Sequence, residues 1–292
     1  LVAFQVSFVS QPAGLDRFPQ DNQATAWVAV RSKEKVLLLS ARPGENRYLE
    51  EILKRRGFDV ASVALNGPPP SPAGYAVVVF NNVERERFSP AYLSEIERFV
   101  TGGKAFVMLG GEHSITAPAV AACAKKFPHL SVLQIDAHAD LRDTYQESKW
   151  SHACAMRRVV EICPAVQVGI RAISSEEAEI IPRLPTKIFW AKDIAHRPPE
   201  EWVPHVVASL TENVYLTVDL DGFDPSYVPA TGTPEPGGLN WHQVTSLIRE
   251  VARKRKIVSM DVVELLPQPG DHASDFLAAK LIYKTLGYIF LR

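Results

Sequence analysis

The chain has 292 residues, of which 46% are hydrophobic, so it is long enough for one large α/β domain or two smaller ones. Lys and Arg together number 32 against 33 Asp and Glu. The resulting net charge of -1 gives no electrostatic reason to expect nucleic acid or a membrane as a partner, and small molecules are expected instead.

Residues 1–35 predict an N-terminal, β-rich extension. Two alternating stretches, VAFQVSFV and ATAWVAV, flank the Pro-, Gly- and Asp-rich segment QPAGLDRFPQDN and are expected to form strands around a loop. The opening lacks a basic lead, and no apolar run reaches about 18 residues, so neither a signal peptide nor a membrane span is expected. Because the first residue is Leu, a trimmed chain that has lost an export signal stays open.

From residue 36 onward, strand and helix patterns alternate. VLLLSA, the helical NRYLEEILKRRG and DVASVAL predict a parallel β-α-β unit. YAVVVF follows, then a helix opened by Ser89 and Pro90, then the strand KAFVML. Further apolar runs lie at residues 131–135, 165–170, 186–190, 213–218 and 256–263. This alternation predicts one three-layer α/β/α domain over residues 36–292, with a mainly parallel sheet.

Polar residues follow four of these apolar runs. In AFVMLGGEHS, two glycines allow a tight turn before Glu112 and His113. In SVLQIDAHAD, Asp136, His138 and Asp140 occupy every second position, so on an extended strand all three would project to one side. No Lys or Arg lies in that run, and a cation is the simplest counter-charge for its carboxylates. A solvated loop with incidental acids is the alternative.

The other two polar strand ends are acidic. In NVYLTVDLDGFDPS, Asp219 and Asp221 again lie two residues apart, although an Asp-rich loop would look the same. In KIVSMDVVEL, Asp261 and Glu264 follow the apolar run, and Asp261 could simply cap the neighbouring turn. Open parallel sheets bind ligands outside the carboxyl ends of their strands. We therefore expect the four motifs to converge at one edge of the sheet.

Together these motifs predict a site for two metal ions. The candidate ligands are two histidines and four aspartates: His113, Asp136, His138, Asp140, Asp219 and Asp221. They exceed what one cation usually needs and suit two ions about 3.5–4 Å apart. Oxygen-rich ligation without thiolate favours a hard divalent ion, Mn²⁺ ahead of Zn²⁺. A water shared by two such ions loses a proton near neutral pH and becomes a nucleophile.

The motifs GGEHS, DAHAD, VDLDGFDP, ATGTPEPGG and SMDVVEL resemble, in order and spacing, the ureohydrolase family, which contains arginase and agmatinase. The resemblance runs from about residue 104 to the C-terminus. It implies an arginase-like fold and two Mn²⁺ per chain, held by the six ligands above. It also implies a hydroxide that attacks a guanidinium carbon to give urea and an amine, and a homo-oligomer, either a trimer or a hexamer.

The same resemblance implies three catalytic roles. Glu264 matches the residue that receives the guanidinium, and a carboxylate can pair with two parallel N–H donors. His152, in KWSHACAMRR, matches a histidine that contacts the substrate and moves protons to the departing amine. The residues alone would equally suit a surface histidine there. Asp140 would accept a hydrogen bond from the hydroxide besides binding metal.

The three cysteines, Cys123, Cys154 and Cys163, are odd in number and lack CxxC spacing. They indicate neither a disulfide framework nor a structural zinc site, and a reducing cytoplasm is expected. Cys154 lies two residues beyond His152, which suggests a Cys/His nucleophile. That alternative is discounted because a metal-held hydroxide needs no thiolate and a buried cysteine is usually inert.

The segment LRDTYQESKWSHACAMRR resembles agmatinases, particularly the archaeal type that also acts on aminopropyl-agmatine, more than arginases. We therefore expect agmatine to be cleaved to putrescine and urea, a step of polyamine biosynthesis. Asp143 or Glu147 would meet the distal ammonium. Aminopropyl-agmatine, arginine and guanidinobutyrate are alternative substrates. A deacetylase with one Zn²⁺ and a metal-binding relative without catalysis also stay open.

Residues before about 104 do not resemble the usual beginning of the family. Residues 21–111 instead resemble the glutamine-amidotransferase-like domain of some bacterial envelope proteins, without its catalytic signature. They supply strand, helix, strand, helix and strand, so they are expected to complete the same sheet. A chain joined from two sources at the shared LGG also stays open.

Overall fold

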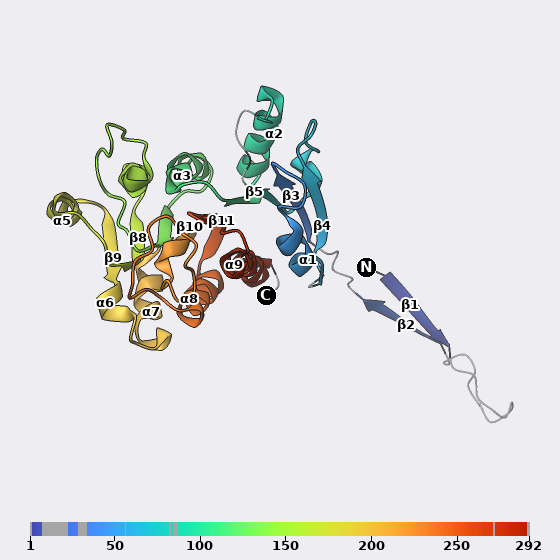
Figure 1. The fold of residues 1–292 in the computed structure, drawn as a ribbon. Helices are drawn as coiled ribbons and strands as arrows, with labels where there is room; N and C mark the ends of the chain where they lie inside the picture. The colour runs from blue at the N-terminus through green and yellow to red at the C-terminus, as the bar shows by residue number, and fades with distance from the viewer. Residues whose placement is uncertain are drawn as a thin grey trace. The chain divides into compact units, whose positions relative to one another are not determined.

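The computed structural model describes residues 2–7, 23–28, 34–55, 57–81, 83, 87–270 and 272–290. The chain divides into two compact units, residues 1–33 and 34–292. In the first unit, β1 (Val2–Ser7) and β2 (Gln23–Val28) pair antiparallel (Figure 1). These are the two strands expected from the alternating stretches, and the loop expected between them lies outside the described residues.

The second unit is built around a parallel sheet. Nine described strands form it: β3 (Lys35–Ser40), β4 (Asp59–Ala64), β5 (Val77–Asn81), β6 (Ala105–Leu109), β7 (Leu130–Ile135), β8 (Ala165–Ile170), β9 (Thr186–Trp190), β10 (Asn213–Asp219) and β11 (Lys256–Val263). Their order is β4-β3-β5-β6-β11-β10-β7-β8-β9, and each neighbouring pair among them is parallel. The predicted parallel sheet is confirmed, and β3, β4 and β5 belong to it.

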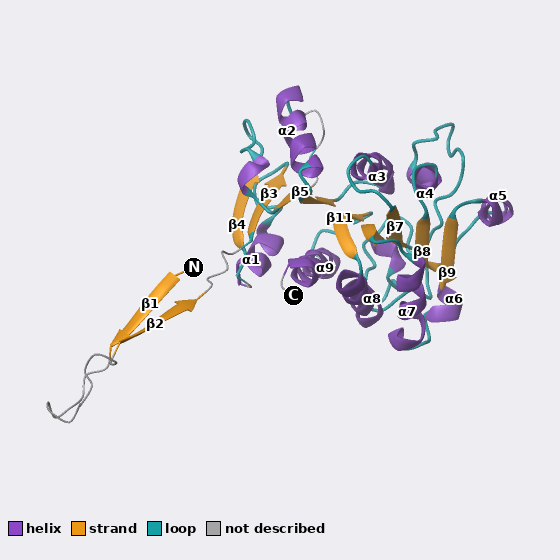
Figure 2. Cartoon of the chain, turned by 180° about the vertical axis from the view of Figure 1, so that it is seen from behind, coloured by secondary structure: helices purple, strands orange, loops and turns teal. Residues whose placement is uncertain are grey.

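Helices cover both faces of this sheet, which confirms the three layers (Figures 1 and 2). One face carries α1 (Arg47–Arg55), α6 (Ala191–Ile194), α7 (Pro199–Ser209), α8 (Trp241–Lys254) and α9 (Ala273–Phe290). The other carries α2 (Pro90–Thr101), α3 (Thr116–Ala124) and α4 (Ala155–Val160), and α5 (Ser175–Ile180) follows β8. The Ser89 side chain caps α2, as predicted. None of the helices in the described residues has both the length and the apolar character to cross a bilayer.

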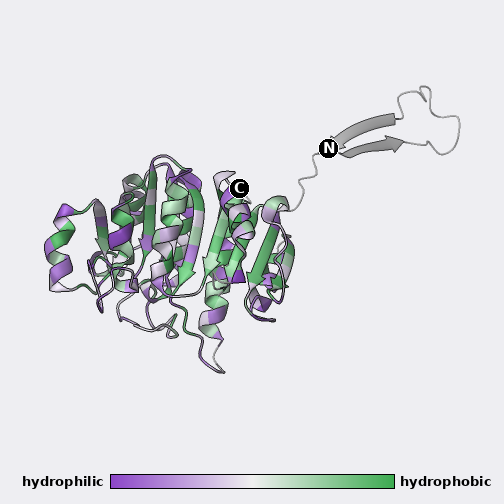
Figure 3. Cartoon of the chain, turned by 90° about the horizontal axis from the view of Figure 1, so that it is seen from above, coloured by the Kyte–Doolittle hydropathy of each residue, from purple (hydrophilic) through white to green (hydrophobic). Residues whose placement is uncertain are grey.

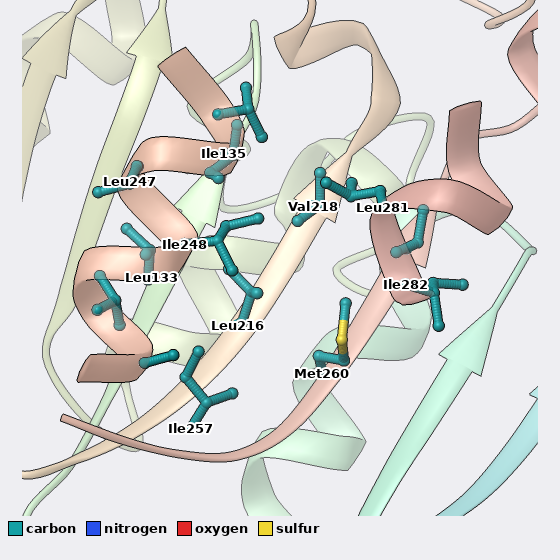
Figure 4. Packing of buried hydrophobic residues seen from close by; sticks show 14 of the residues in the cluster. Leu133, Ile135, Leu216, Val218, Leu247, Ile248, Ile257, Met260, Leu281 and Ile282 are labelled. Atoms are coloured by element: carbon teal, nitrogen blue, oxygen red, sulfur yellow. The ribbon is translucent and has the colours of Figure 1, made fainter. Parts of the chain in front are cut away.

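Side chains of the strands alternate between two hydrophobic cores. In β3, Val36 and Leu38 pack on the face that carries α1, whereas Leu37 and Leu39 pack on the face that carries α2. Figure 3 shows that the strands are largely hydrophobic, and Figure 4 shows α8 and α9 packing over β7, β10 and β11. Each fully buried Leu or Ile contributes about 1.5–3 kcal/mol, so the sheet is a firm platform for the loops that leave its strands.

Four neighbouring strands, in the order β6, β11, β10 and β7, end together. Val218 of β10 lies beside Ile135 of β7 and Val262 of β11, and Val262 lies beside Leu109 of β6. Each of these residues is the last or next to last of its strand. The segments after the four strands are therefore brought to one edge of the sheet, as the four sequence motifs predict.

Candidate metal centre

Residues 136–140 continue the predicted extended strand only in part, because β7 ends at Ile135 and of these five residues His138 alone forms a β-bridge to a neighbouring segment, at Ala172. The strand ends one residue before Asp136. The backbone N–H of His138 donates to Asp136 Oδ1 at 2.6 Å, and Asp140 has a φ of 55°. This local hydrogen bond is typical of Asp, whose side chain competes for nearby backbone donors. The local hydrogen bond and the left-handed backbone of Asp140, as well as strand alternation, therefore set where the three side chains lie.

His113 lies at the centre of a first cluster of metal-capable groups. It follows Gly110 and Gly111, whose φ values of 95° and 79° turn the chain sharply after β6. Its Nδ1 lies 3.1 Å from Asp136 Oδ2 and 2.9 Å from Asp140 Oδ2. His113 is completely buried, and its Nδ1 has no hydrogen-bond partner among the described residues. A buried nitrogen facing carboxylates in this way fits a metal ligand.

A second cluster shares Asp136 with the first. His138 Nδ1 lies 3.0 Å from Asp221 Oδ2 and 3.7 Å from Asp136 Oδ1. Within each cluster, ligand atoms of three residues lie within 4.8 Å of one another. Asp219 adjoins the first cluster, with its Oδ2 3.5 Å from His113 Nδ1. The structure thus brings the six candidate ligands together, and Asp136 belongs to both clusters.

Buried negative charge dominates the site. Burial, together with the charge of Asp136, raises the pKa of Asp140 to about 6 and raises the pKa values of Asp219 and Asp221 as well. Burial alone would lower the pKa of His138, but its contacts with Asp136 and Asp221 raise it to about 11. Carboxylate and imidazole groups that gather so much buried negative charge are suitable ligands for a divalent metal ion.

A buried network behind His113 orients its ring. His113 Nε2 lies 2.9 Å from Thr217 Oγ1, which lies 3.4 Å from Thr116 Oγ1. Asp261 Oδ2 accepts hydrogen bonds from Thr116 Oγ1 at 2.9 Å and from the Tyr215 hydroxyl at 2.7 Å. The expectation that Asp261 caps a turn is wrong, because it is fully buried inside β11. Groups that hold the second ring nitrogen fix a metal-binding histidine in its orientation.

Glu264 and His152 lie beside these clusters. Glu264 follows β11 with a φ of 60°, and its Oε1 accepts a hydrogen bond from the His113 backbone N–H at 2.7 Å. Burial raises the pKa of Glu264. His152 begins a short helix, and its Nδ1 lies 3.1 Å from Glu112 Oε2. The sequence shows Glu112 only as the neighbour of His113, so this pairing is a new finding.

A cavity of about 540 Å³ opens onto the metal-capable groups; we call it the metal cavity. Its walls include His138, Asp140, Asp219, Asp221, Glu264, His152, Glu112, Thr233, Arg142 and Tyr145. Thr233 Oγ1 donates a hydrogen bond to Asp221 Oδ2 at 3.2 Å. Thr233 was not among the predicted site residues, although its motif ATGTPEPGG was one of those that carry the family resemblance.

Arg171 holds the loop that forms one wall of this cavity. Its guanidinium donates to the carbonyls of Asp221 at 2.6 Å, Phe223 at 3.2 Å and Glu235 at 2.7 Å. Burial lowers the pKa of Arg171. Nothing in the sequence around Arg171 signals this role, because the three carbonyls of the loop that it contacts are at least 50 positions away.

Two other sequence expectations have different outcomes. Asp143 and Glu147 are not among the residues that line the metal cavity, and Asp143 Oδ1 lies 2.7 Å from the Arg158 guanidinium, so a contact of either acid with a substrate ammonium stays a prediction that this geometry does not support. Cys154 is buried, and burial raises the pKa of its thiol. A thiol in that state is a poor nucleophile, in agreement with the discounted Cys/His alternative.

Comparisons with known proteins agree with this geometry. A family model described as the arginase family matches residues 48–287, so the match begins well before residue 104. A Synechocystis sp. protein named N(1)-aminopropylagmatine ureohydrolase is 43% identical over 196 residues, which are 66% of this chain and 63% of that protein. The Thermus thermophilus protein of the same name is 36% identical over 264 residues, covering 89% of this chain and 83% of that protein.

A solved structure, the agmatine ureohydrolase of Thermoplasma volcanium, has a similar fold. The TM-score is 0.64 at 26% identity, over 88% of this chain and 90% of that chain. At this coverage the likeness extends beyond residues 104–292, which make up about two-thirds of the chain.

Proposed function

Because the chain belongs to the arginase family, we propose that it is a ureohydrolase, which cleaves a guanidinium C–N bond to give urea and an amine. The convergence of two histidines and four aspartates beside Glu264, at one edge of the sheet, carries the proposal. Such a site combines negative charge for binding cations with a carboxylate for binding the planar guanidinium.

We propose two Mn²⁺ ions as the cofactor. The ligands would be His113, Asp136, His138, Asp140, Asp219 and Asp221. Hard oxygen donors with two imidazoles and no thiolate suit Mn²⁺. When bound, the pair would supply Lewis acidity and a water that loses its proton near neutral pH.

Glu264 would bind the guanidinium. The His113 N–H fixes one of its oxygens, so the carboxylate is oriented before the substrate arrives. Two parallel N–H donors of a guanidinium can then pair with its face. Asp140 would accept a hydrogen bond from the attacking water and would so orient a lone pair of that water toward the guanidinium carbon.

His152 would deliver a proton to the departing amine and contact the substrate. Glu112 holds its Nδ1, which leaves Nε2 for the amine nitrogen. A histidine is suited to this transfer because its unperturbed pKa lies near the working pH. Glu112 would keep the ring in position through each turnover.

The proposed reaction is agmatine to putrescine and urea, in polyamine biosynthesis. Aminopropyl-agmatine is an alternative substrate that the names of two relatives support, and arginine and guanidinobutyrate are further alternatives. We also propose that residues 36–292 form a single ureohydrolase-like domain after the extension of residues 1–35. The protein would act in the cytoplasm as a homo-oligomer, a trimer or hexamer, without nucleic acid or membrane partners.

Urea release tests the proposal. The Mn²⁺-loaded chain is assayed with agmatine, aminopropyl-agmatine, arginine and guanidinobutyrate, and metal content is measured on the same sample. We expect two manganese ions per chain and urea from agmatine or its aminopropyl derivative. A single bound Zn²⁺ with deacetylation would refute it in favour of a deacetylase. Two bound ions without urea from any guanidine would refute it in favour of a non-catalytic metal-binding relative.

A further inference from the structure

Two glutamines lie side by side within an apolar part of the sheet. Gln134 of β7 pairs in register with Gln167 of β8, and both side chains are completely buried. The cross-strand pair two residues earlier, Val132 and Ala165, belongs to the hydrophobic core on the face that carries α3 and α4. Another apolar pair at the position of the glutamines would continue this core without burying a polar group. The two amides therefore need a reason beyond packing.

Hydrogen bonds join these amides into a chain that runs across three strands toward Asp136. Thr186 Oγ1, in β9, donates to Gln167 Oε1 at 2.8 Å. Gln167 Nε2 donates to Gln134 Oε1 at 2.5 Å, and Gln134 Nε2 donates to Asp136 Oδ2 at 2.5 Å. An ionised carboxylate only accepts hydrogen bonds, so Gln134 must present its nitrogen to Asp136 and its oxygen to Gln167. The chain therefore has one direction and ends with an N–H donor at the Asp136 carboxylate.

The same two amides also hold the backbone that follows β7. Gln134 Nε2 donates to the carbonyl of His138 at 3.3 Å, and Gln167 Nε2 donates to the carbonyl of Ala139 at 2.7 Å. Both oxygens and both nitrogens of the pair thus have partners, which offsets the cost of burying them. The segment that carries three of the six candidate ligands is held at one carboxylate and at two carbonyls.

The Asp136 carboxylate accepts one hydrogen bond on each oxygen. Gln134 Nε2 donates to Oδ2, and the His138 backbone N–H donates to Oδ1. A carboxylate oxygen has two lone pairs, so one stays available on each oxygen. Oδ2 lies 3.1 Å from His113 Nδ1 in the first cluster, and Oδ1 lies 3.7 Å from His138 Nδ1 in the second. The two donors therefore set the rotation of the one carboxylate that belongs to both clusters.

We propose that Gln134 and Gln167 are positioning residues for Asp136. Gln167 is anchored by Thr186 and fixes the Gln134 amide, and Gln134 fixes the Asp136 carboxylate at an angle that serves both clusters. This inference rests on the proposed function, because it concerns the affinity for the proposed Mn²⁺ ions. Hydrogen-bond partners that orient a metal-binding carboxylate contribute to metal affinity although they do not touch the ion.

Calorimetric titration of the full chain with Mn²⁺ tests the inference, and urea unfolding of the metal-free chain measures stability in parallel. Methionine has nearly the length of glutamine and no N–H donor. We expect Gln134→Met to lower Mn²⁺ affinity about 10–100-fold and Gln167→Met to lower it less, since Gln134 then keeps its bond to Asp136.

Gln243→Met is the matched control. Gln243 in α8 is also buried, and its Nε2 donates to the carbonyls of Ile194, Ala195 and Arg197, away from the candidate ligands. This variant should lower the urea midpoint and bind Mn²⁺ like the parent. A merely structural role of Gln134 would give the same pattern, so the ratio of Mn²⁺ affinity between variant and parent separates positioning from stability.

The double variant Gln134→Met/Gln167→Met tests whether the two amides act in series. If they do, it should bind Mn²⁺ no more weakly than Gln134→Met alone, because the effect of Gln167 passes through Gln134. Independent effects that multiply would overturn the inference. So would a loss of affinity below about threefold in Gln134→Met, or an equal loss in Gln243→Met.

The remaining outcomes keep the inference and the proposed function apart. If Gln134→Met does not fold, Gln167→Met decides, and Mn²⁺ affinity equal to that of the parent would overturn the inference. Two bound ions without urea from any guanidine would count against the proposed function alone, since the inference is decided by Mn²⁺ affinity. A parent chain that binds no Mn²⁺ would overturn both.

Discussion

Replacing Gly222 with Ala should damage the metal centre through backbone contact alone. Gly222 ends the short helix η7 (Leu220–Gly222), one residue after Asp221. A Cβ at this position would lie 2.7 Å from the backbone nitrogen and 3.0 Å from the Cα of Asp136. The φ of Gly222 is not left-handed, so an alanine backbone is acceptable there and the cost arises from these contacts.

The magnitude depends on how firmly both backbones are held. An ordinary contact of a Cβ begins near 3.4 Å, so the segments after β7 and β10 must separate by about 0.7 Å. The Asp136 N–H donates to Val168 O at 3.1 Å, and the Leu239 N–H donates to Gly222 O at 3.1 Å, which resist that movement. Overpacking of this kind costs about 1–3 kcal/mol. Because ligand positions tolerate only about 0.5 Å, Mn²⁺ affinity should fall at least about tenfold.

Urea unfolding of the metal-free chain and calorimetric titration with Mn²⁺ measure the two effects separately. Gly287→Ala in α9 is the matched control, because a Cβ there meets nothing within 4 Å. It should stabilise the chain by up to about 1 kcal/mol, since glycine is a poor helix former. If Gly222→Ala lost less than about 0.5 kcal/mol and bound Mn²⁺ like the parent, the two strand ends would not be as closely packed as argued.

Three more predictions concern the surroundings of the site. Asp261→Asn should weaken Mn²⁺ binding about 10–100-fold in calorimetry, because it disturbs the hydrogen-bond network behind the ring of His113. The control Thr245→Val in α8 should leave Mn²⁺ binding unchanged. Removing metal with EDTA should lower the melting temperature, and Mn²⁺ at about 100 times its Kd should restore about 2.7 kcal/mol. Hydrogen bonds from Ser226 and Gly238 outweigh the effect of burial and lower the pKa of Asp224 to about 2. The ionised Asp224 therefore contributes stability above about pH 4, and this contribution is lost as the pH falls toward 2. Urea midpoints of Asp224→Asn should therefore decline less over that window than those of the parent.

The strands and the convergence of their ends could be predicted because both depend on local pattern. The runs that became β8, β9 and β11 match the predicted bounds. In β8 every residue is buried, as expected for a parallel strand that is covered on both faces. Parallel strands also expose their carboxyl ends at one edge. Residues placed directly after such strands, such as Asp136 and Glu264, therefore come together without any knowledge of side-chain contacts.

Contacts between distant side chains could not be predicted in this way. Thr116 and Asp261 are 145 positions apart and Glu112 and His152 are 40 apart, and no periodic pattern links either pair. Helices α1 and α9 likewise pack on the same face of the sheet, although they come from near opposite ends of the second unit.

The backbone at Asp140 and Glu264 shows why local propensity also fails at the site itself. Their φ values of 55° and 60° lie in the left-handed region, which glycine adopts most easily. Such conformations cost about 1–3 kcal/mol when a side chain is present. Glycine would relieve that cost at both positions. It would also remove the Asp140 carboxylate, which lies beside the His113 ring, and the Glu264 carboxylate, which accepts a hydrogen bond from the His113 backbone N–H. The surrounding sheet therefore stabilises a conformation that costs free energy at a residue with a side chain, and it does so where the proposed chemistry needs an acid.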